Sequence, residues 1–230
     1  MSIVVLTGAG ISAESGVATF RDSGGLWEGH AVDAVATPEG FAADPELVQR
    51  FYDARRRALA AVEPNAAHRA LARLEQEHDD DVLLVTQNVD DLHERAGSRR
   101  VLHMHGELRR ARCVACGTRS PWHEDLLPGP PCPACGEPAL RPDVVWFGEV
   151  PYDLDEIFTA LAQCTTFVAV GTSGAVYPAA GFVMMATNAG AHTVELNLAA
   201  SEMTSRFEDV RDGPASVLVP QWVDEVLGRA

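Results

Sequence analysis

The sequence predicts an α/β fold in which a Rossmann-like parallel sheet domain carries an inserted small zinc-binding module. Short apolar segments alternate with helix-like segments along most of the chain, as in proteins built on a parallel sheet. The first apolar segment runs directly into a Gly-x-Gly turn. Two Cys-x-x-Cys pairs interrupt the alternation in the middle of the chain.

The individual elements follow from periodicity and from the residues that end each run. Short apolar runs that end at Gly, Asn or a polar turn are typical of buried parallel strands. We expect strands at 3–6, 82–86, 101–104, 167–170 and 193–196. Apolar residues that recur at helical spacing predict helices. We expect these at 45–61, 65–77, 153–164, 178–188 and 221–227.

The chain divides at the cysteine-rich stretch. We expect residues 1–106 to form the first part of the Rossmann-type domain, with a helical segment near 38–78. Residues 107–142 are rich in Cys, Pro, Gly and Arg, and form the small module. Residues 143–230 complete the Rossmann-type domain.

Composition excludes several function classes. The chain has 230 residues, which suits one medium-sized domain, and its net charge of −15 argues against a basic nucleic-acid footprint. All 18 basic residues are arginine, so a Schiff-base or phosphate-loop lysine is excluded. No apolar run reaches membrane-spanning length and no signal-peptide pattern opens the chain. We therefore expect a cytoplasmic protein.

The glycine-dense turn at Gly8, Ala9 and Gly10 predicts a nucleotide site. Glycine lets the backbone turn tightly and approach a ligand closely, and a strand that turns into a helix start presents free N–H groups to an anion. The spacing Gly8-x-Gly10-x-x-Ala13 fits a loose dinucleotide fingerprint. Because glycine-rich turns after strands are common, this motif by itself is weak.

The four paired cysteines predict a metal site. Fifteen residues separate Cys113-x-x-Cys116 from Cys132-x-x-Cys135, within the range for a four-thiolate zinc site. Four protein ligands leave no open position, so zinc here would be structural. Two disulfides or a redox pair are the alternatives, and the paired spacing and expected compartment disfavour them.

Polar residues follow two of the predicted strands. Gln87, Asn88 and Asp90 come after the strand at 82–86, and His103 and His105 lie at the end of the strand at 101–104. In open parallel sheets, ligands bind outside the carboxyl ends of the strands, so these residues could meet the glycine turn in one crevice. Either histidine could act as a general base near neutral pH, and spacing does not choose between them.

Seven segments together resemble one family. GAGISAESGVATFR, TQNVDDLHERAG, HMHGEL, the two Cys-x-x-Cys pairs, RPDVVWFGE, GTSGAVYPAA and VELN occur in this order between about Val5 and Val219. They resemble the sirtuins, the NAD-dependent protein-lysine deacylases. The resemblance implies a Rossmann-type large domain and a smaller zinc-bearing module, with NAD and an acyl-lysine peptide bound between them.

The resemblance also implies residue roles. It selects His105, the histidine before glycine, as the general base, with Asn88 as a second catalytic residue. VVWFGE, with Val145 and Phe147, looks like a strand that pairs with the substrate backbone. The implied contacts to NAD are Gly8, Ala9, Gly10, Ser12, Phe20, Arg21, Trp27, Gln87, Asn88, Asp90, Gly171, Thr172, Ser173, Asn197, Leu198, Ala199 and Ala215.

The implied chemistry consumes NAD as a co-substrate. The acyl oxygen of the modified lysine attacks the ribose carbon that bears nicotinamide, and His105 then deprotonates a ribose hydroxyl. The products are nicotinamide, O-acyl-ADP-ribose and unmodified lysine. A neutral imidazole suits this role near pH 7.

The segment FYDARRRALA bears on the acyl group. Tyr52 and Arg55 are three residues apart and share a helix face, and the guanidinium offers a planar fork to a carboxylate. The alternative is that Arg55, Arg56 and Arg57 form one solvated basic face. In a sirtuin-like chain, Tyr-x-x-Arg resembles the pair that binds malonyl, succinyl or glutaryl lysine. We expect a preference for acidic acyl groups, with deacetylation also present.

Three other functions use parts of the same pattern. A protein mono-ADP-ribosyltransferase would use the NAD loops without Tyr52 and Arg55. A non-catalytic NAD or ADP-ribose-binding module would not need His105, and a dehydrogenase would have the full glycine fingerprint. The expected partners are acylated lysines of proteins, without membrane or direct nucleic-acid binding. The sequence leaves the oligomeric state open and is compatible with a monomer.

Overall fold

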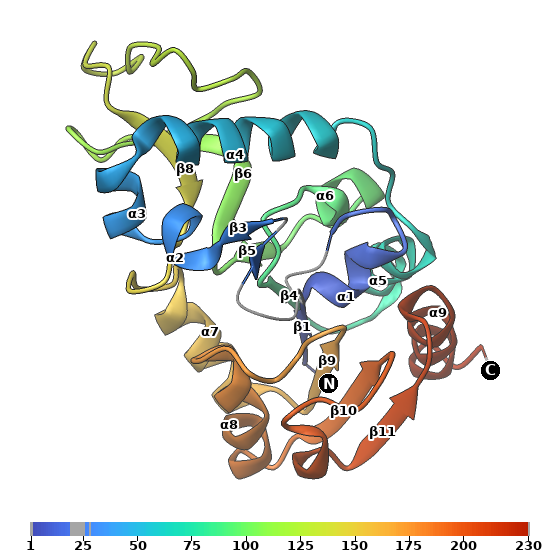
Figure 1. Ribbon diagram of the computed structural model, residues 1–230. Helices are drawn as coiled ribbons and strands as arrows, with labels where there is room; N and C mark the ends of the chain where they lie inside the picture. Colours follow the sequence, from blue (N-terminus) through green and yellow to red (C-terminus); the bar gives the residue numbers. More distant parts are fainter. Residues whose placement is uncertain (1, 19–25, 28, 230) are drawn as a thin grey trace.

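A six-stranded parallel sheet forms the centre of the protein (Figure 1). The computed structural model describes residues 2–18, 26–27 and 29–229. The sheet order is β11-β10-β9-β1-β4-β5, and every neighbouring pair is parallel. The strands are β1 (Ile3–Thr7), β4 (Val82–Thr86), β5 (Val101–His103), β9 (Thr166–Val170), β10 (His192–Asn197) and β11 (Asp209–Asp212).

Helices cover both faces of this sheet (Figure 1). Successive strand residues point to opposite faces, so Val5 packs with α5 (Ala66–Glu77) and α9 (Ala215–Val226). Val4 packs on the other face, with α7 (Leu154–Gln163) and α8 (Phe182–Asn188). Because both faces are buried, the strands read as continuous apolar runs rather than alternating ones. The prediction of a Rossmann-like fold is confirmed.

The strand order reverses direction between β1 and β9, where the loops after both strands meet. The Gly8 N–H donates to the Val170 carbonyl, and the Gly10 N–H donates to the Gly171 carbonyl. A Cβ atom on Gly8 would lie 2.7 Å from the Gly171 oxygen, too close for any side chain. Open α/β sheets bind ligands at this type of switch point.

Shorter elements connect β1 to β4 and carry clear capping signals. Thr37 and Asp44 accept backbone hydrogen bonds at the starts of α3 (Pro38–Ala43) and α4 (Pro45–Leu59), and each is followed by proline at the first helical position. The remaining elements here are α1 (Ala9–Ala13), β2 (Leu26–Trp27), β3 (His30–Ala31), α2 (Val32–Val35) and, after β4, α6 (Leu92–Ala96). Two 3₁₀ turns lie at Ala179–Gly181 and Thr204–Arg206.

A separate antiparallel sheet forms the inserted module. Its strands are β6 (Gly106–Cys113), β7 (Arg119–Pro121) and β8 (Leu140–Val144), in the order β7-β6-β8. Its own small core consists of five buried residues: Ala111, Cys113, Leu126, Cys132 and Leu140. An inserted small module was predicted, and the division at residues 107 and 142 stays a prediction.

A buried ion pair attaches α4 to this module. The Asp53 carboxylate lies 2.6 Å from Arg56 Nη1 and accepts the N–H groups of Leu126 and Leu127. Arg56 Nε donates to the Leu108 carbonyl at 2.9 Å. Both charged side chains are 2% exposed. Removing one partner of a buried pair leaves an uncompensated charge, which is costly.

We expect Asp53→Ala to lower the free energy of unfolding by about 3–5 kcal/mol, as measured by urea denaturation followed by circular dichroism. Asp125→Ala is the matched control, because it removes an exposed ion pair from the neighbouring Arg57 on the same helix. That change should cost less than about 1 kcal/mol. Equal losses in the two variants would contradict the role given to Asp53.

The structure corrects three details of the predicted elements. VVWFGE is not a strand, because β8 ends at Val144 and Gly148 turns the chain at φ +89°. Helix α9 begins at Ala215 and continues through Pro220, six residues before the predicted start. Strand β11 was missed because its sequence, DVRD, is charged and half-exposed at the edge of the sheet.

Among the helices of the described residues, none combines the length and the apolar character needed to cross a membrane.

Candidate active site

The predicted site residues gather at the carboxyl ends of four adjacent strands. Gly8 follows β1, Gln87 follows β4, His105 lies just beyond β5, and Gly171 follows β9. The Gln87 N–H donates to the Thr7 carbonyl at 2.9 Å, which joins the first two loops. The structure therefore brings the glycine turn, the Gln87 loop and His105 to one edge of the sheet.

Asn88 and Asp90 are fixed by Ser12. Asn88 Nδ2 donates to the Gly8 carbonyl at 3.2 Å and to Ser12 Oγ at 3.1 Å. Ser12 Oγ in turn donates to Asp90 Oδ2 at 2.9 Å. All three side chains are buried, so the network fixes the two loops in one arrangement before any ligand binds. Burial raises the pKa of Asp90, and the Leu92 N–H and Ser12 oppose that rise.

His68 completes this network, and sequence reasoning missed it. The Asn65 N–H donates to His68 Nδ1 at the start of α5, so Nε2 carries the hydrogen and donates to Ser12 Oγ at 3.3 Å. Burial lowers the pKa of His68 to about 4, aided by Arg69. A neutral His68 is thus built into the site. Its only signal in the sequence is its place three residues after the capping Asn65.

His105 is held as a neutral base. Its Nδ1 lies 3.1 Å from the Gln87 carbonyl, and because a carbonyl only accepts, Nδ1 carries the hydrogen. Nε2 then keeps a free lone pair, with no partner among the described residues. Burial lowers the pKa of His105, although the hydrogen bond to Gln87 opposes this. The imidazole is therefore neutral at pH 7 and able to take a proton.

His103 has both ring nitrogens engaged in hydrogen bonds. Nδ1 lies 3.2 Å from the Asn88 carbonyl and Nε2 lies 2.7 Å from Glu94 Oε1. Burial lowers the pKa of His103, but the hydrogen bond and charge of Glu94 outweigh it, so the net shift is upward. With two acceptors in place, His103 acts as a donor at both nitrogens. Sequence spacing did not distinguish His103 from His105 as a general base. The hydrogen-bond partners do, because only His105 has a ring nitrogen without a partner among the described residues.

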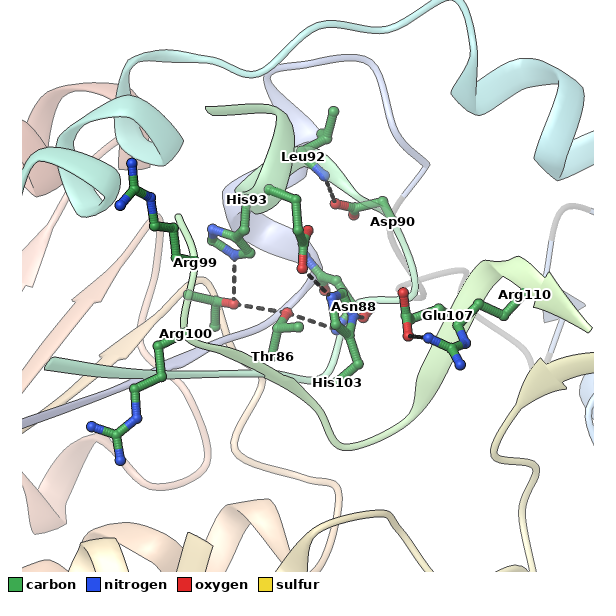
Figure 2. A network of polar contacts seen from close by, with 12 residues as sticks. Thr86, Asn88, Asp90, Leu92, His93, Arg99, Arg100, His103, Glu107 and Arg110 are labelled. Atoms are coloured by element: carbon green, nitrogen blue, oxygen red, sulfur yellow. Dashed lines mark hydrogen bonds and ion pairs between the residues drawn. The ribbon is translucent and has the colours of Figure 1, made fainter. Parts of the chain in front are cut away.

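A buried layer of hydroxyls and one histidine supports the Asn88 loop from below (Figure 2). Thr86 Oγ1 accepts the Asn88 N–H at 3.0 Å and a hydrogen bond from Thr7 Oγ1 at 2.9 Å. Thr7 Oγ1 also lies 3.0 Å from His93 Nε2. Burial lowers the pKa of His93 well below its ordinary value, so this layer carries no charge at neutral pH.

The remaining predicted NAD contacts lie after β9 and β10. Asn197 Nδ2 donates to the Thr172 carbonyl at 2.7 Å, which ties the two loops together. The Leu198 N–H donates to Asn197 Oδ1 at 3.1 Å, and the Leu198 side chain is exposed, as is Ala199. Ser173 is half-buried in the same loop as Thr172, and Ala215 is buried at the start of α9.

Phe20 and Arg21, two further predicted contacts, lie outside the described residues. Trp27 lies beside the predicted acyl-binding pair, and its predicted contact with NAD stays a prediction. Its ring centroid is 6.2 Å from that of Tyr52, and the Arg55 guanidinium stacks over it at 4.0 Å.

The three consecutive arginines of α4, at positions 55–57, do not form one solvated face. Arg55 is half-buried over Trp27 and Phe51, Arg56 is buried against Asp53, and only Arg57 is exposed. Tyr52 is fully buried, and burial raises its pKa far above the ordinary value. Tyr52 and Arg55 therefore belong to an enclosed aromatic cluster, not to a solvated patch.

Of the two residues predicted to contact the substrate backbone, Val145 is hydrogen-bonded to His105 and Phe147 is hydrogen-bonded to Ala36. The Val145 N–H donates to the His105 carbonyl at 2.8 Å, and the Phe147 N–H donates to the Ala36 carbonyl at 2.9 Å. The Phe147 side chain is 48% exposed. Because Val145 precedes a turn, any pairing with a peptide here involves a short segment.

The four cysteines fit a zinc ion. Their ligand atoms all lie within 4.8 Å of one another, with Cys113–Cys135 at 3.7 Å and Cys116–Cys132 at 3.8 Å. Tetrahedral bonds of about 2.3 Å would place zinc-bound sulfurs about 3.8 Å apart. Disulfides are excluded here, since each cysteine is free. The tetrathiolate would hold zinc with no position left for a substrate.

Comparison with known proteins identifies the family of the chain. A sequence model of the Sir2 family matches residues 8–178. An NAD-dependent protein deacylase of Salmonella typhimurium is 58% identical over 228 residues, which covers 98% of this chain and 84% of that protein. One of Pasteurella multocida is 56% identical and is covered over 97% of its length.

Solved structures give the same result. A Sir2 homologue in complex with NAD superposes with a TM-score of 0.89 at 40% identity, covering 98% of this chain and 89% of that one. A second Sir2 structure, with an inhibitor, 2′-O-acetyl-ADP-ribose and a deacetylated p53 peptide, has a TM-score of 0.82 at 30% identity, covering 99% and 94%. Since the family model matches most of the chain and the strand order and cysteine cluster agree with it, the chain belongs to the Sir2 family, the sirtuins.

Proposed function

We propose that the chain is an NAD-dependent protein-lysine deacylase that removes short acidic acyl groups as well as acetyl groups. The observation that carries the proposal is the state of His105, an imidazole kept neutral by burial with Nδ1 donating to Gln87 and Nε2 free. A protein that only bound NAD would have no use for such a base. The two relatives reported above are both named NAD-dependent protein deacylase, which supports the proposal.

The residues around the switch point suit NAD. Glycine at positions 8, 10 and 171 lets the two loops touch, where a Cβ atom would clash with backbone. Without side chains at these positions, a pyrophosphate can come close to the backbone. When bound, NAD supplies a ribose carbon from which nicotinamide departs. We assign Asn88 and Asp90 to holding the nicotinamide and its ribose, since Ser12 fixes both side chains.

We assign one proton transfer to His105. Its Nε2 takes the proton of a ribose hydroxyl, so that this oxygen can attack the acyl carbon. During this transfer Nδ1 keeps its hydrogen and continues to donate it to the Gln87 carbonyl. This hydrogen bond fixes the orientation of the ring. The backbone of His105 is fixed as well, because its carbonyl accepts from Val145.

The acyl preference rests on Tyr52 and Arg55. Tyr52 offers a phenolic hydrogen and Arg55 offers a guanidinium. Both side chains lie in an aromatic cluster with Trp27 and Phe51. A charge-assisted bond to a carboxylate is strong in such a partly dry setting. Malonyl, succinyl and glutaryl lysine end in a carboxylate, whereas acetyl lysine does not.

We expect Arg55→Met to lower the ratio of desuccinylation to deacetylation about 10- to 100-fold, because a hydrogen-bonded charge pair with the acyl carboxylate is lost. Mass spectrometry of products from succinyl- and acetyl-lysine peptides with NAD measures both rates. Arg57→Met is the matched control, since Arg57 is exposed on the same helix. An unchanged ratio in Arg55→Met would show that another group binds the carboxylate.

The same assay separates deacylation from ADP-ribosyl transfer. A deacylase releases nicotinamide only when acylated peptide is present, and it forms O-acyl-ADP-ribose. A transferase would release nicotinamide without acylated peptide and would leave ADP-ribose on protein.

Acylated lysines of proteins are the proposed partners, and the cytoplasm is the proposed location. A tetrathiolate metal site is typical of reducing compartments, where thiols are not oxidised to disulfides. The net charge of −15 does not favour nucleic acid.

A further inference from the structure

Trp146 joins the segment beside His105 to the proposed acyl-binding helix. It follows β8, next to Val145, whose N–H donates to the His105 carbonyl. Its indole Nε1 donates to the Tyr52 hydroxyl at 3.0 Å, between two side chains that are both buried. The two rings lie 6.3 Å apart, centroid to centroid.

This hydrogen bond has a fixed direction. An indole N–H only donates, whereas a phenol accepts and also donates its single hydrogen. With one lone pair of the Tyr52 oxygen occupied by Trp146, the phenolic hydrogen must point elsewhere. The described residues offer it no acceptor. A ligand with an acceptor oxygen at that position would complete the pair.

The phenol stays a donor across the physiological range. Burial raises the pKa of Tyr52, and the hydrogen bond from Trp146 only partly offsets it. Accepting a bond from Trp146 also polarises the phenol, which strengthens the bond that its hydrogen makes.

The indole itself is held on several sides. The Arg141 guanidinium stacks over its ring at 3.5 Å, and Phe41 lies 5.2 Å away, centroid to centroid. Glu149 accepts the Trp146 backbone N–H at 2.9 Å and binds Arg141 through both carboxylate oxygens, at 2.9 and 2.7 Å. The direction of the indole N–H is therefore set by the fold and not by the ligand.

We propose that Trp146 is a positioning residue for acyl selection, which aims the Tyr52 hydroxyl at the terminal carboxylate of an acidic acyl group. The inference rests on the proposed deacylase function and adds a residue outside the Tyr-x-x-Arg motif. It requires that Trp146 act through Tyr52, and that its effect depend on the acyl group.

The experiment compares four proteins: wild type, Trp146→Phe, Tyr52→Phe and the double variant. Phenylalanine keeps an aromatic ring at position 146 and removes the N–H. We expect Trp146→Phe to lower the ratio of kcat/KM for succinyl- over acetyl-lysine peptide about tenfold, mainly through a higher KM for the succinyl peptide. The double variant should match Tyr52→Phe alone, because the two residues form one chain of bonds.

Each other outcome overturns the inference in a distinct way. If wild type does not desuccinylate, the proposed acyl preference fails and the inference fails with it. If wild type desuccinylates and Trp146→Phe has the same ratio of kcat/KM for succinyl- over acetyl-lysine peptide as wild type, only the inference about Trp146 fails. If Trp146→Phe lowers kcat/KM equally with both peptides, Trp146 contributes only to packing. The same conclusion follows if the effects of the two substitutions multiply in the double variant.

A second measurement needs no variant at position 146. The chain has four tryptophans, so wild type gives four indole N–H signals in ¹H–¹⁵N spectra, and Phe substitutions at 27, 122 and 222 assign the fourth by elimination. Both peptides would contact Val145 and Phe147 on either side of Trp146, so we expect the Trp146 signal to shift with each, and to shift further with succinyl-lysine peptide than with acetyl-lysine peptide. Equal shifts with both peptides would overturn the inference.

Discussion

Replacing His105 with alanine should slow deacylation about 10²- to 10⁴-fold, the usual contribution of a positioned general base. The reason is the geometry at Nδ1, where the Gln87 carbonyl holds the hydrogen and leaves Nε2 as the acceptor. The rate of product formation from acyl-lysine peptide and NAD, followed by mass spectrometry, measures the loss. Circular dichroism checks that the variant is folded.

The pH profile of the wild type gives an independent check on the same base. Only the neutral imidazole accepts a proton, so activity should fall as pH drops through the His105 pKa. Because burial lowers that pKa below 6.5, the enzyme should keep most of its activity at pH 6.5 and lose it at lower pH. The acid limb should be missing from the residual activity of His105→Ala.

His123→Ala is the matched control for this pair of measurements. His123 is exposed in the inserted module, so its loss should leave both the rate and the pH profile unchanged. A His105→Ala protein that turned over at the wild-type rate would exclude His105 as the base. The doubly engaged His103 would then need to be reconsidered.

The parts of the fold that the sequence predicted are those governed by local chemistry. The strand at 82–86 was predicted to the residue because it is a short run of buried apolar side chains with a polar turn after it. The metal cluster was predicted from spacing because the two Cys-x-x-Cys pairs are themselves the binding motif. Strand β11 was missed because three of its four residues are charged, so it lacks the run of buried apolar side chains that marks the other strands.

Long-range contacts explain what the sequence left open at the site. His103 and His105 are equivalent by spacing, and only their partners, Glu94 and Gln87, separate them. His68 reaches Ser12 across 56 positions of the chain, and Trp146 reaches Tyr52 across 94. Such pairs form only when distant segments of the chain fold together, so no local sequence pattern predicts them.

Replacing Cys116 with serine should abolish stoichiometric zinc and unfold the inserted module. The module has a core of only five buried residues, and two of these, Cys113 and Cys132, belong to the cluster. So small a core supplies little stability, whereas structural zinc contributes on the order of 10 kcal/mol in small domains. Metal analysis would give one zinc per chain in the wild type and a clear deficit in the variant.

Loss of the module should also stop catalysis, although no cysteine lies at the reacting groups. Strand β6 begins at Gly106, immediately after His105, and pairs with β8, whose end leads to Val145. Without zinc, both segments that fix the His105 backbone lose their support. Cys164→Ser is the matched control, because Cys164 is buried under the Rossmann sheet away from the cluster, and it should keep its zinc. A Cys116→Ser protein with full zinc and full activity would show that the tetrathiolate does not support the site.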